Sequence, residues 1–323
     1  MVEVGDLLLA MYGATSGDIA VSKIKGAINQ AILCIRTKQN KKFIESVWNK
    51  HVSKNLRKYL QGGQGNLSAD IVKGISFFFP TLKEQKKIAN LVSLLDERIT
   101  TQNKIIDKLQ SLIKGLEDNL LDNPLWEKTY LRSFMQFFPT NSLSWEQLSY
   151  KEGAIRNLHY GLIHSFQTRG INSASLPMIK NEAVPKQYIL CQVGDVAFAD
   201  ASEDTGEIAK SVEFVNTIEG DTICGLHTIH GRDIKNRTVV GFKGFAFNSR
   251  YFHNQIKRLA QGTKVFSITA NNLSSCYVYL PDLETQKAIV NLLKTYEAKL
   301  LVSKRLLEHY EKQKQYLLRQ MFI

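Results

Sequence analysis

Pairs of histidine and carboxylate side chains are the residues of this sequence that could do chemistry on their own. His227 and His230 have a spacing that can hold a metal ion on a helix, but the residues around them predict a strand and supply no third ligand. Ser202-Glu-Asp204 offers adjacent carboxylates that a metal-dependent nuclease could use, yet no other nuclease residues accompany it. We therefore expect structural histidines, no catalytic residue and no metal site.

Two further stretches resemble cofactor motifs without matching them. Gln61-Gly-Gly-Gln-Gly-Asn66 is rich in glycine, but it lacks the lysine and the following helix of a phosphate-binding loop. Asp122-Asn-Pro-Leu-Trp126 resembles the Asn-Pro-Pro-aromatic motif of amino-methyltransferases. It lacks the second proline and follows a helix end, where Asn-Pro is a usual stop signal. The sequence therefore predicts no cofactor bound to this chain.

The apolar residues and the cysteines indicate the compartment in which the protein is found. No run approaches the roughly 18 uncharged apolar residues of a membrane span, and Met1-Val-Glu-Val-Gly-Asp6 lacks the basic and apolar regions of a signal peptide. The cysteines have no CxxC spacing, which favours buried, reduced thiols. They are Cys34, Cys191, Cys224 and Cys276. We expect a cytoplasmic protein.

Basic residues are concentrated in two segments. The net charge of the 323 residues is +12. Residues 38–58 contain seven basic side chains and one acid, and residues 242–264 contain five basic side chains and no acid. Such patches attract polyanions, of which the phosphate backbone of nucleic acid is the commonest. A solvated basic face is the alternative.

Both basic segments lie within an internal repeat. Residues 80–91 match residues 281–292 at seven of twelve positions without a gap, at an offset of 201. Upstream, Val4-Gly-Asp6 matches Val193-Gly-Asp195, and a Gln-Gly pair recurs later in each copy. Each copy therefore predicts a strand, a loop, a mixed region, a Gln-Gly loop, a short β run, a proline and a long helix.

The two long helices are the clearest predicted elements. Thr81 and Glu84 have the spacing of a capping box, and Asp282 can cap the second helix. Apolar residues then recur every three to four positions, as in a heptad seam, over about 38 residues or ~57 Å. Gln102 and Ser303 interrupt the two seams at equivalent places. If the helices pair antiparallel, these residues face each other and can fix the register.

The segments between the helices predict an α+β fold. Short β runs occupy residues 188–191, 195–199, 222–225 and 276–280, and a shorter helix is expected near residues 248–259. Residues 1–79 match only the later part of residues 126–280. About 67 residues (126 to 192) have no counterpart before Met1, so we expect a partial first domain.

The order of these motifs, found twice, resembles the specificity subunits of type I restriction-modification systems. The resemblance covers essentially the whole chain, although no single motif is diagnostic. In the second copy it is carried by residues 155–161, 194–204, 225–228, 251–252 and 258–264. In the first copy it is carried by residues 5–9, 12–17, 29–33 and 61–67.

This resemblance implies two α/β target-recognition domains separated by two long antiparallel coiled-coil helices. Each domain would read half of a split double-stranded DNA site, and the helices would act as a ruler and dock two modification subunits. Those subunits would methylate adenine with S-adenosylmethionine, and ATP-dependent, Mg-using restriction subunits would join them, so this chain itself would be non-catalytic. The implied domains are residues 1–79 (partial first recognition domain), 80–122 (first helix), 123–280 (second recognition domain) and 281–323 (second helix).

Two alternatives remain open from the residues. The chain could be a truncated or silent specificity fragment that acts only as an interaction module, or part of a fused restriction-methylation enzyme. The second alternative would need motifs that we do not find.

The predicted DNA-binding residues are polar or basic side chains, together with loops in which glycine lets the backbone approach a duplex. In the first copy they are Thr15, Ser16, Lys54, Arg57, Lys58, Gln61, Gln64 and Asn66. In the second copy they are His159, Tyr160, Ser202, Lys210, Arg250, Lys257, Arg258, Gln261, Gly262, Thr263 and Lys264. Turn chemistry alone is the alternative for each of them.

Overall fold

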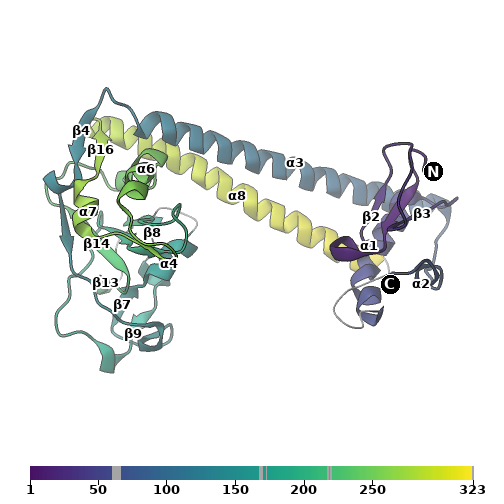
Figure 1. Cartoon of the computed structure of the whole chain (residues 1–323), viewed down its shortest axis with the longest axis horizontal. Helices are drawn as coiled ribbons and strands as arrows, with labels where there is room; N and C mark the ends of the chain where they lie inside the picture. Colours follow the sequence, from purple (N-terminus) through teal and green to yellow (C-terminus); the bar gives the residue numbers. More distant parts are fainter. Residues whose placement is uncertain (60–66, 167–169, 172, 217, 219, 322–323) are drawn as a thin grey trace. The chain divides into compact units, whose positions relative to one another are not determined.

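The computed structural model describes residues 1–59, 67–166, 170–171, 173–216, 218 and 220–321 (Figure 1), with the side chains of 52–59 left aside. Its contacts divide the chain into two compact units, Met1–Asp107 with Leu301–Ile323 (unit 1) and Lys108–Leu300 (unit 2). Each unit contains part of both long helices, α3 (Leu82–Leu121) and α8 (Leu283–Met321). No helix in these ranges is long and apolar enough to cross a membrane.

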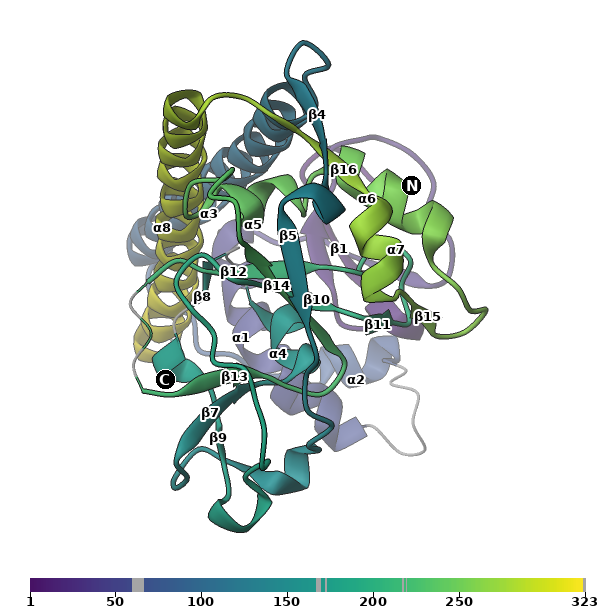
Figure 2. The ribbon, with the colours of Figure 1, turned by 90° about the vertical axis from the view of Figure 1, so that its left-hand side faces the viewer.

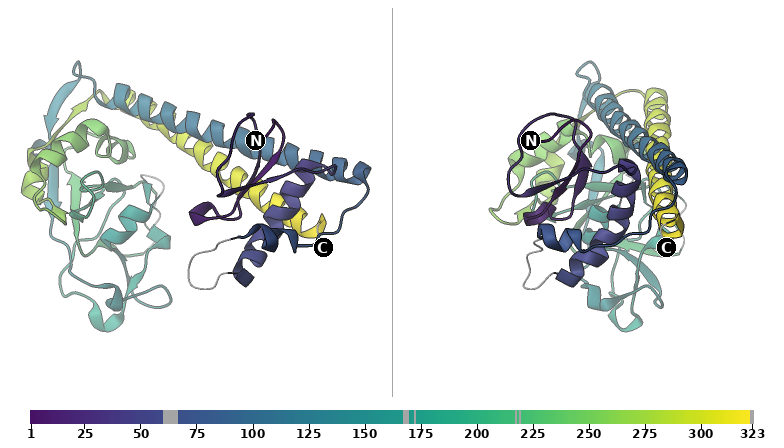
Figure 3. Two further views of the ribbon diagram at one scale, coloured as in Figure 1. Left: turned by 45° about the vertical axis from the view of Figure 1, so that its right-hand side comes forward. Right: turned by 90° about the vertical axis from the view of Figure 1, so that its right-hand side faces the viewer.

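Unit 1 is built around a small antiparallel sheet (Figure 3). Its order among the described residues is β2 (Ile19–Val21), β1 (Leu7–Ala10), β3 (Ile32–Ile35), and helices α1 (Lys41–Tyr59) and α2 (Ala69–Lys73) follow. Trp48 of α1 packs with the sheet residue Leu9. Phe43 of the same helix packs against Ala89 of α3 and Leu318 of α8. Helix α1 therefore joins the sheet to the helix pair.

Unit 2 contains a larger mixed α/β fold (Figure 2). The described residues form a sheet of order β5-β14-β10-β12-β8 and a second sheet of order β13-β7-β9-β6. The strands of the first are Met135–Phe138, Thr228–Asp233, Val196–Ala199, Ser211–Phe214 and Gly170–Ile171. Those of the second are Thr222–Cys224, Ile155–Leu158, Met178–Ile179 and Leu148–Ser149.

The described part of unit 2 also contains two strand pairs and four short α-helices. The pairs are β16 (Tyr277–Leu280) with β4 (Glu127–Tyr130), and β11 (Ala201–Ser202) with β15 (Phe266–Ser267). The helices are α4 (Tyr160–Ser165), α5 (Phe242–Ala246), α6 (Arg250–Leu259) and α7 (Ala270–Ser275).

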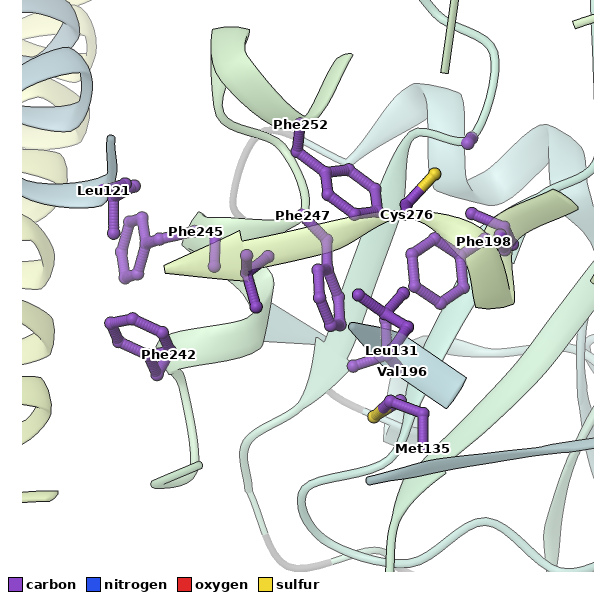
Figure 4. Close-up of a cluster of buried hydrophobic side chains, with 14 of the residues drawn as sticks. Leu121, Leu131, Met135, Val196, Phe198, Phe242, Phe245, Phe247, Phe252 and Cys276 are labelled. Atoms are coloured by element: carbon purple, nitrogen blue, oxygen red, sulfur yellow. The ribbon is translucent and has the colours of Figure 1, made fainter. Parts of the chain in front are cut away.

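The central strand β10 is buried on both faces. Val196 and Phe198 enter one apolar cluster, whereas Ala197 and Ala199 enter another, because successive strand residues point to opposite faces. The first cluster contains four phenylalanines of the α5–α6 region, seen with Leu121 of α3 in Figure 4. They are Phe242, Phe245, Phe247 and Phe252. Burying each such ring contributes roughly 1.5–3 kcal/mol, so this layer fastens the sheet to the helices of unit 2.

The repeat motif at the helix starts is explained by a buried glutamine. Gln286 is 1% exposed. Its Nε2 donates to the carbonyl oxygens of Pro281 (2.9 Å) and Arg237 (3.0 Å), and its Oε1 accepts from the Val239 amide (3.0 Å). The side chain therefore ties the first turn of α8 to the loop that precedes α5.

Gln85, at the equivalent position of the first copy, does the same in unit 1. It is also 1% exposed. Its Nε2 donates to the Pro80 carbonyl (2.8 Å) and to Gln39 Oε1 (2.7 Å), and its Oε1 accepts from the Asn40 amide (3.0 Å). The recurring glutamine thus fixes each long helix to its own unit.

The helix caps predicted from the sequence are confirmed. The Thr81 amide donates to Glu84 Oε2 at 3.0 Å, and the Glu84 amide donates to Thr81 Oγ1 at 3.4 Å. The Thr285 amide donates to Asp282 Oδ1 at 2.9 Å. Local spacing was enough to place these bonds, because both partners lie within one turn.

The helix pair is antiparallel. In unit 1, Gln102 Nε2 donates to the Ser303 carbonyl oxygen at 3.1 Å, while Asp96 binds Lys314 at 2.6 Å further along. The two interrupting residues therefore meet, although through the backbone of Ser303 rather than its hydroxyl. Their role in fixing the register stays a prediction.

Two predicted strands are wrong. Residues 188–191 form only an isolated bridge, Leu190 with Ile223, and Tyr188, Ile189 and Leu190 are exposed. The β run before Pro80 is not a strand either. Its counterpart in the second copy, β16, is a strand that pairs with β4. Phe78, in this run, is 96% exposed.

Candidate nucleic-acid interface

A backbone hydrogen bond recurs in both units next to the loops that are predicted to contact DNA. In unit 2 the Ile268 amide, just after the Gln-Gly loop, donates to the carbonyl oxygen of Asp200, just after β10 (2.9 Å). In unit 1 the Leu67 amide donates to the carbonyl oxygen of Met11, just after β1 (2.8 Å). The same backbone bond therefore joins equivalent residues in both units, and in unit 2 it brings the two loops together.

The strand that precedes each of these loops begins at a repeated ion pair. Arg232 donates to both carboxylate oxygens of Asp195 at 2.8 and 2.7 Å, and Arg36 donates to Asp6 at 3.1 Å. Burial alone would raise the pKa of Asp195, but the hydrogen bonds from Arg232 and His230 hold it below its usual range. The Val-Gly-Asp repeat thus encodes a charged anchor at the start of β1 and β10.

The Gln-Gly loop of unit 2 is a tight hairpin between α6 and β15. Gln261 and Ser267 exchange backbone hydrogen bonds of 3.0 and 2.8 Å. Gly262 has φ +123°, and a Cβ there would lie 2.0 Å from the Val265 carbonyl oxygen. Only glycine fits this turn. The hairpin presents Thr263 and its neighbours to solvent.

Ser202 is brought to the same hairpin, because β11 pairs with β15 and places Ser202 opposite Phe266. Its hydroxyl accepts a hydrogen bond from the Asp204 amide at 3.1 Å, which orders the loop that follows. Gln261, Thr263 and Lys264 are exposed around it. The structure therefore gathers the predicted residues 202 and 261–264 on one surface.

An aromatic and histidine group borders this surface. Tyr160 lies edge-on to His227, with 5.3 Å between ring centroids, and His227 Nδ1 lies 3.0 Å from Asp200 Oδ1. His159 is buried between Trp145 and Tyr160 and caps α4 through Nδ1. Burial, and then repulsion by His227, lowers the pKa of His159. His159 is therefore neutral near pH 7 and positions Tyr160.

Lys210 lies on the other side of α4 with its charge paired. Its Nζ is 2.9 Å from Glu207 Oε2 and 3.3 Å from the His164 carbonyl oxygen. Burial opposes ionisation of Glu207, but the Lys210 bond outweighs it and the pKa of Glu207 falls below its usual range. A phosphate would have to displace Glu207 to reach Lys210.

Arg250 and Lys257 of α6 are not part of this surface. They line a different cavity of about 620 Å³, together with Lys114 and Asp118 of α3. Arg258, in the last turn of α6, is exposed. The basic segment predicted from charge is therefore split between two faces of unit 2.

In unit 1 the structure describes only part of the predicted site. Thr15 is exposed in the short helical turn after β1, and the Ser16 hydroxyl donates to the Met11 carbonyl oxygen at 3.0 Å. Residues Lys54, Arg57 and Lys58 belong to α1, but their side chains lie outside the description. Gln61, Gln64 and Asn66 lie outside the described residues altogether.

Several residues of this surface escaped sequence reasoning. The sequence predicts no role for Asp200 or His164, and it indicates His227 only as half of a possible metal pair. The internal repeat could have indicated Asp200, because Asp200 and Met11 occupy equivalent positions directly after β10 and β1. The structure also places Cys191 and Cys224 beside His230, which no sequence spacing indicated.

Comparison with known proteins identifies the family. The family described as type I restriction modification DNA specificity domain matches residues 2–111 and 168–311, most of the chain. The chain therefore belongs to the type I restriction-modification specificity subunits, which are the DNA-recognition components of these systems.

Individual relatives agree with this assignment. The type I restriction enzyme MjaVIII specificity subunit of Methanocaldococcus jannaschii is 26% identical over 337 residues, covering 97% of this chain and 77% of that protein. The putative MjaX specificity subunit of the same organism is 25% identical over 269 residues, covering 81% of this chain and 62% of its own length.

Solved structures share the fold. A type I restriction-modification S subunit from M. genitalium superimposes with a TM-score of 0.60 at 14% identity, covering 99% of this chain and 83% of that one. The HsdS subunit from Thermoanaerobacter tengcongensis gives 0.52 at 14% identity, covering 99% and 81%. The predicted fold class, with mixed α/β domains and two long antiparallel helices, is confirmed.

Proposed function

We propose that this chain reads a bipartite double-stranded DNA target, one half with each unit, and that it is the non-catalytic subunit of its complex. The observation that supports this most directly is the repeated backbone bond, Leu67 to Met11 and Ile268 to Asp200, which joins equivalent positions of the two copies. Two equivalent surfaces in one chain are better suited to a DNA target that is split into two half-sites than to one continuous DNA target.

The contacts divide by chemistry. Exposed Gln261, Thr263 and Lys264 on a glycine hairpin are suited to base edges or nearby phosphates, whereas exposed Arg258 in the last turn of α6 is suited to the phosphate backbone. Thr15 and Ser16, with the residues at positions 54–66, would serve unit 1 in the same way. His159 and Gly262 would act by positioning their neighbours rather than by touching DNA.

The long helices would dock the modification subunits. Both carry exposed apolar side chains in spite of being paired with each other, and such exposure favours further protein contacts. In unit 1 these include Leu94 (58% exposed) and Val302 (62%). We propose two modification subunits, joined by restriction subunits, with S-adenosylmethionine, ATP and magnesium bound by those partners.

In this proposal the working domains are residues 1–79 and 123–280 for recognition and residues 80–122 and 281–323 for docking and spacing. The helix of 40 residues in α3 corresponds to ~60 Å at 1.5 Å per residue. That length suits two half-sites separated by an unread spacer.

The proposal is tested by Gly262→Ala in the full chain assembled with its modification subunits. The added Cβ would start 2.0 Å from Val265 O, so the hairpin must move by about 1 Å and one or more base contacts are lost. Losing a base contact worth about 1–3 kcal/mol weakens binding of the preferred duplex about 5- to 150-fold. Binding to random duplex should change little.

Gly220→Ala is the matched control. Gly220 also has positive φ (+66°), but nothing lies within 4 Å of its added Cβ. It should leave the methylated motif unchanged, whereas Gly262→Ala should degrade only one half of that motif. Loss of both halves, or of neither, would refute the assignment of this hairpin. A chain that binds modification subunits but no duplex preferentially would instead be an interaction module.

A further inference from the structure

Three potential metal ligands from separate parts of unit 2 meet at one buried point. Cys191 precedes β10, Cys224 ends β13, and His230 lies in the middle of β14. One ligand atom from each lies within 4.8 Å of the other two, and all three residues are buried. The two Sγ atoms are 3.6 Å apart.

This spacing is close to that of a tetrahedral zinc site. With Zn–S bonds of about 2.3 Å and Zn–N bonds of about 2.0–2.1 Å, tetrahedral geometry separates two sulfurs by about 3.8 Å and a sulfur and a nitrogen by about 3.6 Å. The Sγ–Sγ distance already agrees to about 0.2 Å. The His230 ring nitrogen lies within 4.8 Å of both sulfurs, so a shift of about 1 Å would bring the third ligand within range.

The surroundings of His230 are those of a metal-binding histidine. Its Nε2 is 2.7 Å from Asp195 Oδ2, and Asp195 is itself held by both arms of the Arg232 fork. A carboxylate on one ring nitrogen fixes the tautomer and makes the other nitrogen a better ligand. Nδ1 is then the nitrogen available for an ion.

Charge and access also fit a soft divalent cation. Two thiolates and a neutral imidazole balance the charge of one Zn²⁺, so the complex is neutral in its buried position. Cys224 and His230 both line a cavity of about 580 Å³ that also includes Asn141 and Ser142. Water in that cavity can supply the fourth ligand.

Unit 1 provides an internal comparison. Its counterpart of His230 is Cys34, which pairs across the sheet with Leu8 as His230 pairs with Ala197. Cys34 Sγ donates to Asp6 at 3.5 Å. Among the described residues no second or third soft ligand joins it. Within the part of the chain that the structure describes, the full set occurs in the second copy.

We propose that Cys191, Cys224 and His230 bind one structural Zn²⁺ ion per chain. The ion would tie the segment entering β10 to β13 and β14, and so hold the turn that carries His227 against the loop surface. This site does not depend on the DNA-reading proposal, because its test reads metal content and not DNA binding.

The test is metal analysis of the full-length protein purified under reducing conditions, loaded with Zn²⁺ and dialysed against a weak chelator. We expect about one zinc per chain, lost in Cys224→Ser and in Cys191→Ser but retained in Cys34→Ser. Zinc retained in the first two variants, or lost equally in Cys34→Ser, overturns the proposal.

Two measurements on the unaltered protein test the site even if the cysteine variants do not fold. Co²⁺ in place of zinc should give thiolate-to-cobalt charge-transfer absorption, and Zn²⁺ should protect two of the four thiols from a thiol reagent. Four thiols that react equally with and without zinc would leave the cysteines as free thiols. Two thiols missing without bound metal would mean a Cys191–Cys224 disulfide. Either result refutes the zinc site.

Discussion

Replacing Gln286 with alanine should destabilise unit 2 by about 3 kcal/mol. The side chain makes three hydrogen bonds to backbone groups, at 2.9, 3.0 and 3.0 Å, from a position that is 1% exposed. Each such bond contributes about 1 kcal/mol net, and alanine supplies none of them. The unfolding equilibrium constant of the unit should therefore rise ~150-fold.

Amide hydrogen exchange locates this effect. The Val239 amide donates to Gln286 Oε1, so its protection should fall in Gln286→Ala. Gln85→Ala should deprotect the Asn40 amide of unit 1 instead and leave Val239 unchanged. Gln313→Ala, on an exposed part of α8, is the control and should cost almost nothing. A loss below about 0.5 kcal/mol in Gln286→Ala, or unchanged protection of Val239, would show that the glutamine does not hold the helix to the unit.

Two further perturbations test the helix pair and the histidine cap. Gln102→Leu should raise the thermal unfolding midpoint, since residue 102 is only 6% exposed. A buried apolar side chain in a helix seam stabilises the fold by more than a single hydrogen bond does. A fall in the midpoint would mean that the hydrogen bond from Gln102 to Ser303 is needed for stability. His159 has a lowered pKa, so the unfolded chain binds its proton more readily. The resulting stability is complete above the ordinary histidine pKa of about 6.5 and is lost as the pH falls through the lower folded value. Urea midpoints between pH 7.5 and 5.5 should fall less steeply in His159→Asn, which keeps a capping side chain, and an identical slope in both proteins would contradict this account.

The sequence predicted correctly the features that depend on residues close together in the chain, and it was less accurate for features that depend on distant residues. The capping box of Thr81 and Glu84 and the Asp282 cap depend on residues within one turn, and the structure contains both. The strand predicted at residues 188–191 failed because β structure needs a partner, and alternation along one segment does not say whether a partner is present. The run before Pro80 failed for the same reason.

The candidate site was harder to predict than the helices. Charge placed Arg250 and Lys257 with the hairpin, but the packing of α6 turned them toward α3. His159 looked like a contact residue because its motif stood beside Tyr160, yet it is buried and caps α4. The side on which a polar residue emerges depends on what its helix packs against, and the sequence around it does not contain that information.

The sequence alone established that the chain is a repeat with two long capped helices and that it resembles the type I specificity subunits, because periodicity, caps and motif order are properties of neighbouring residues. Only the tertiary structure showed that Leu67 and Ile268 make the same bond, that Gln286 reaches Val239, and that Cys191, Cys224 and His230 meet. These contacts join residues tens of positions apart. Sheet register and helix packing bring them together, and both are decided by the burial of the whole core.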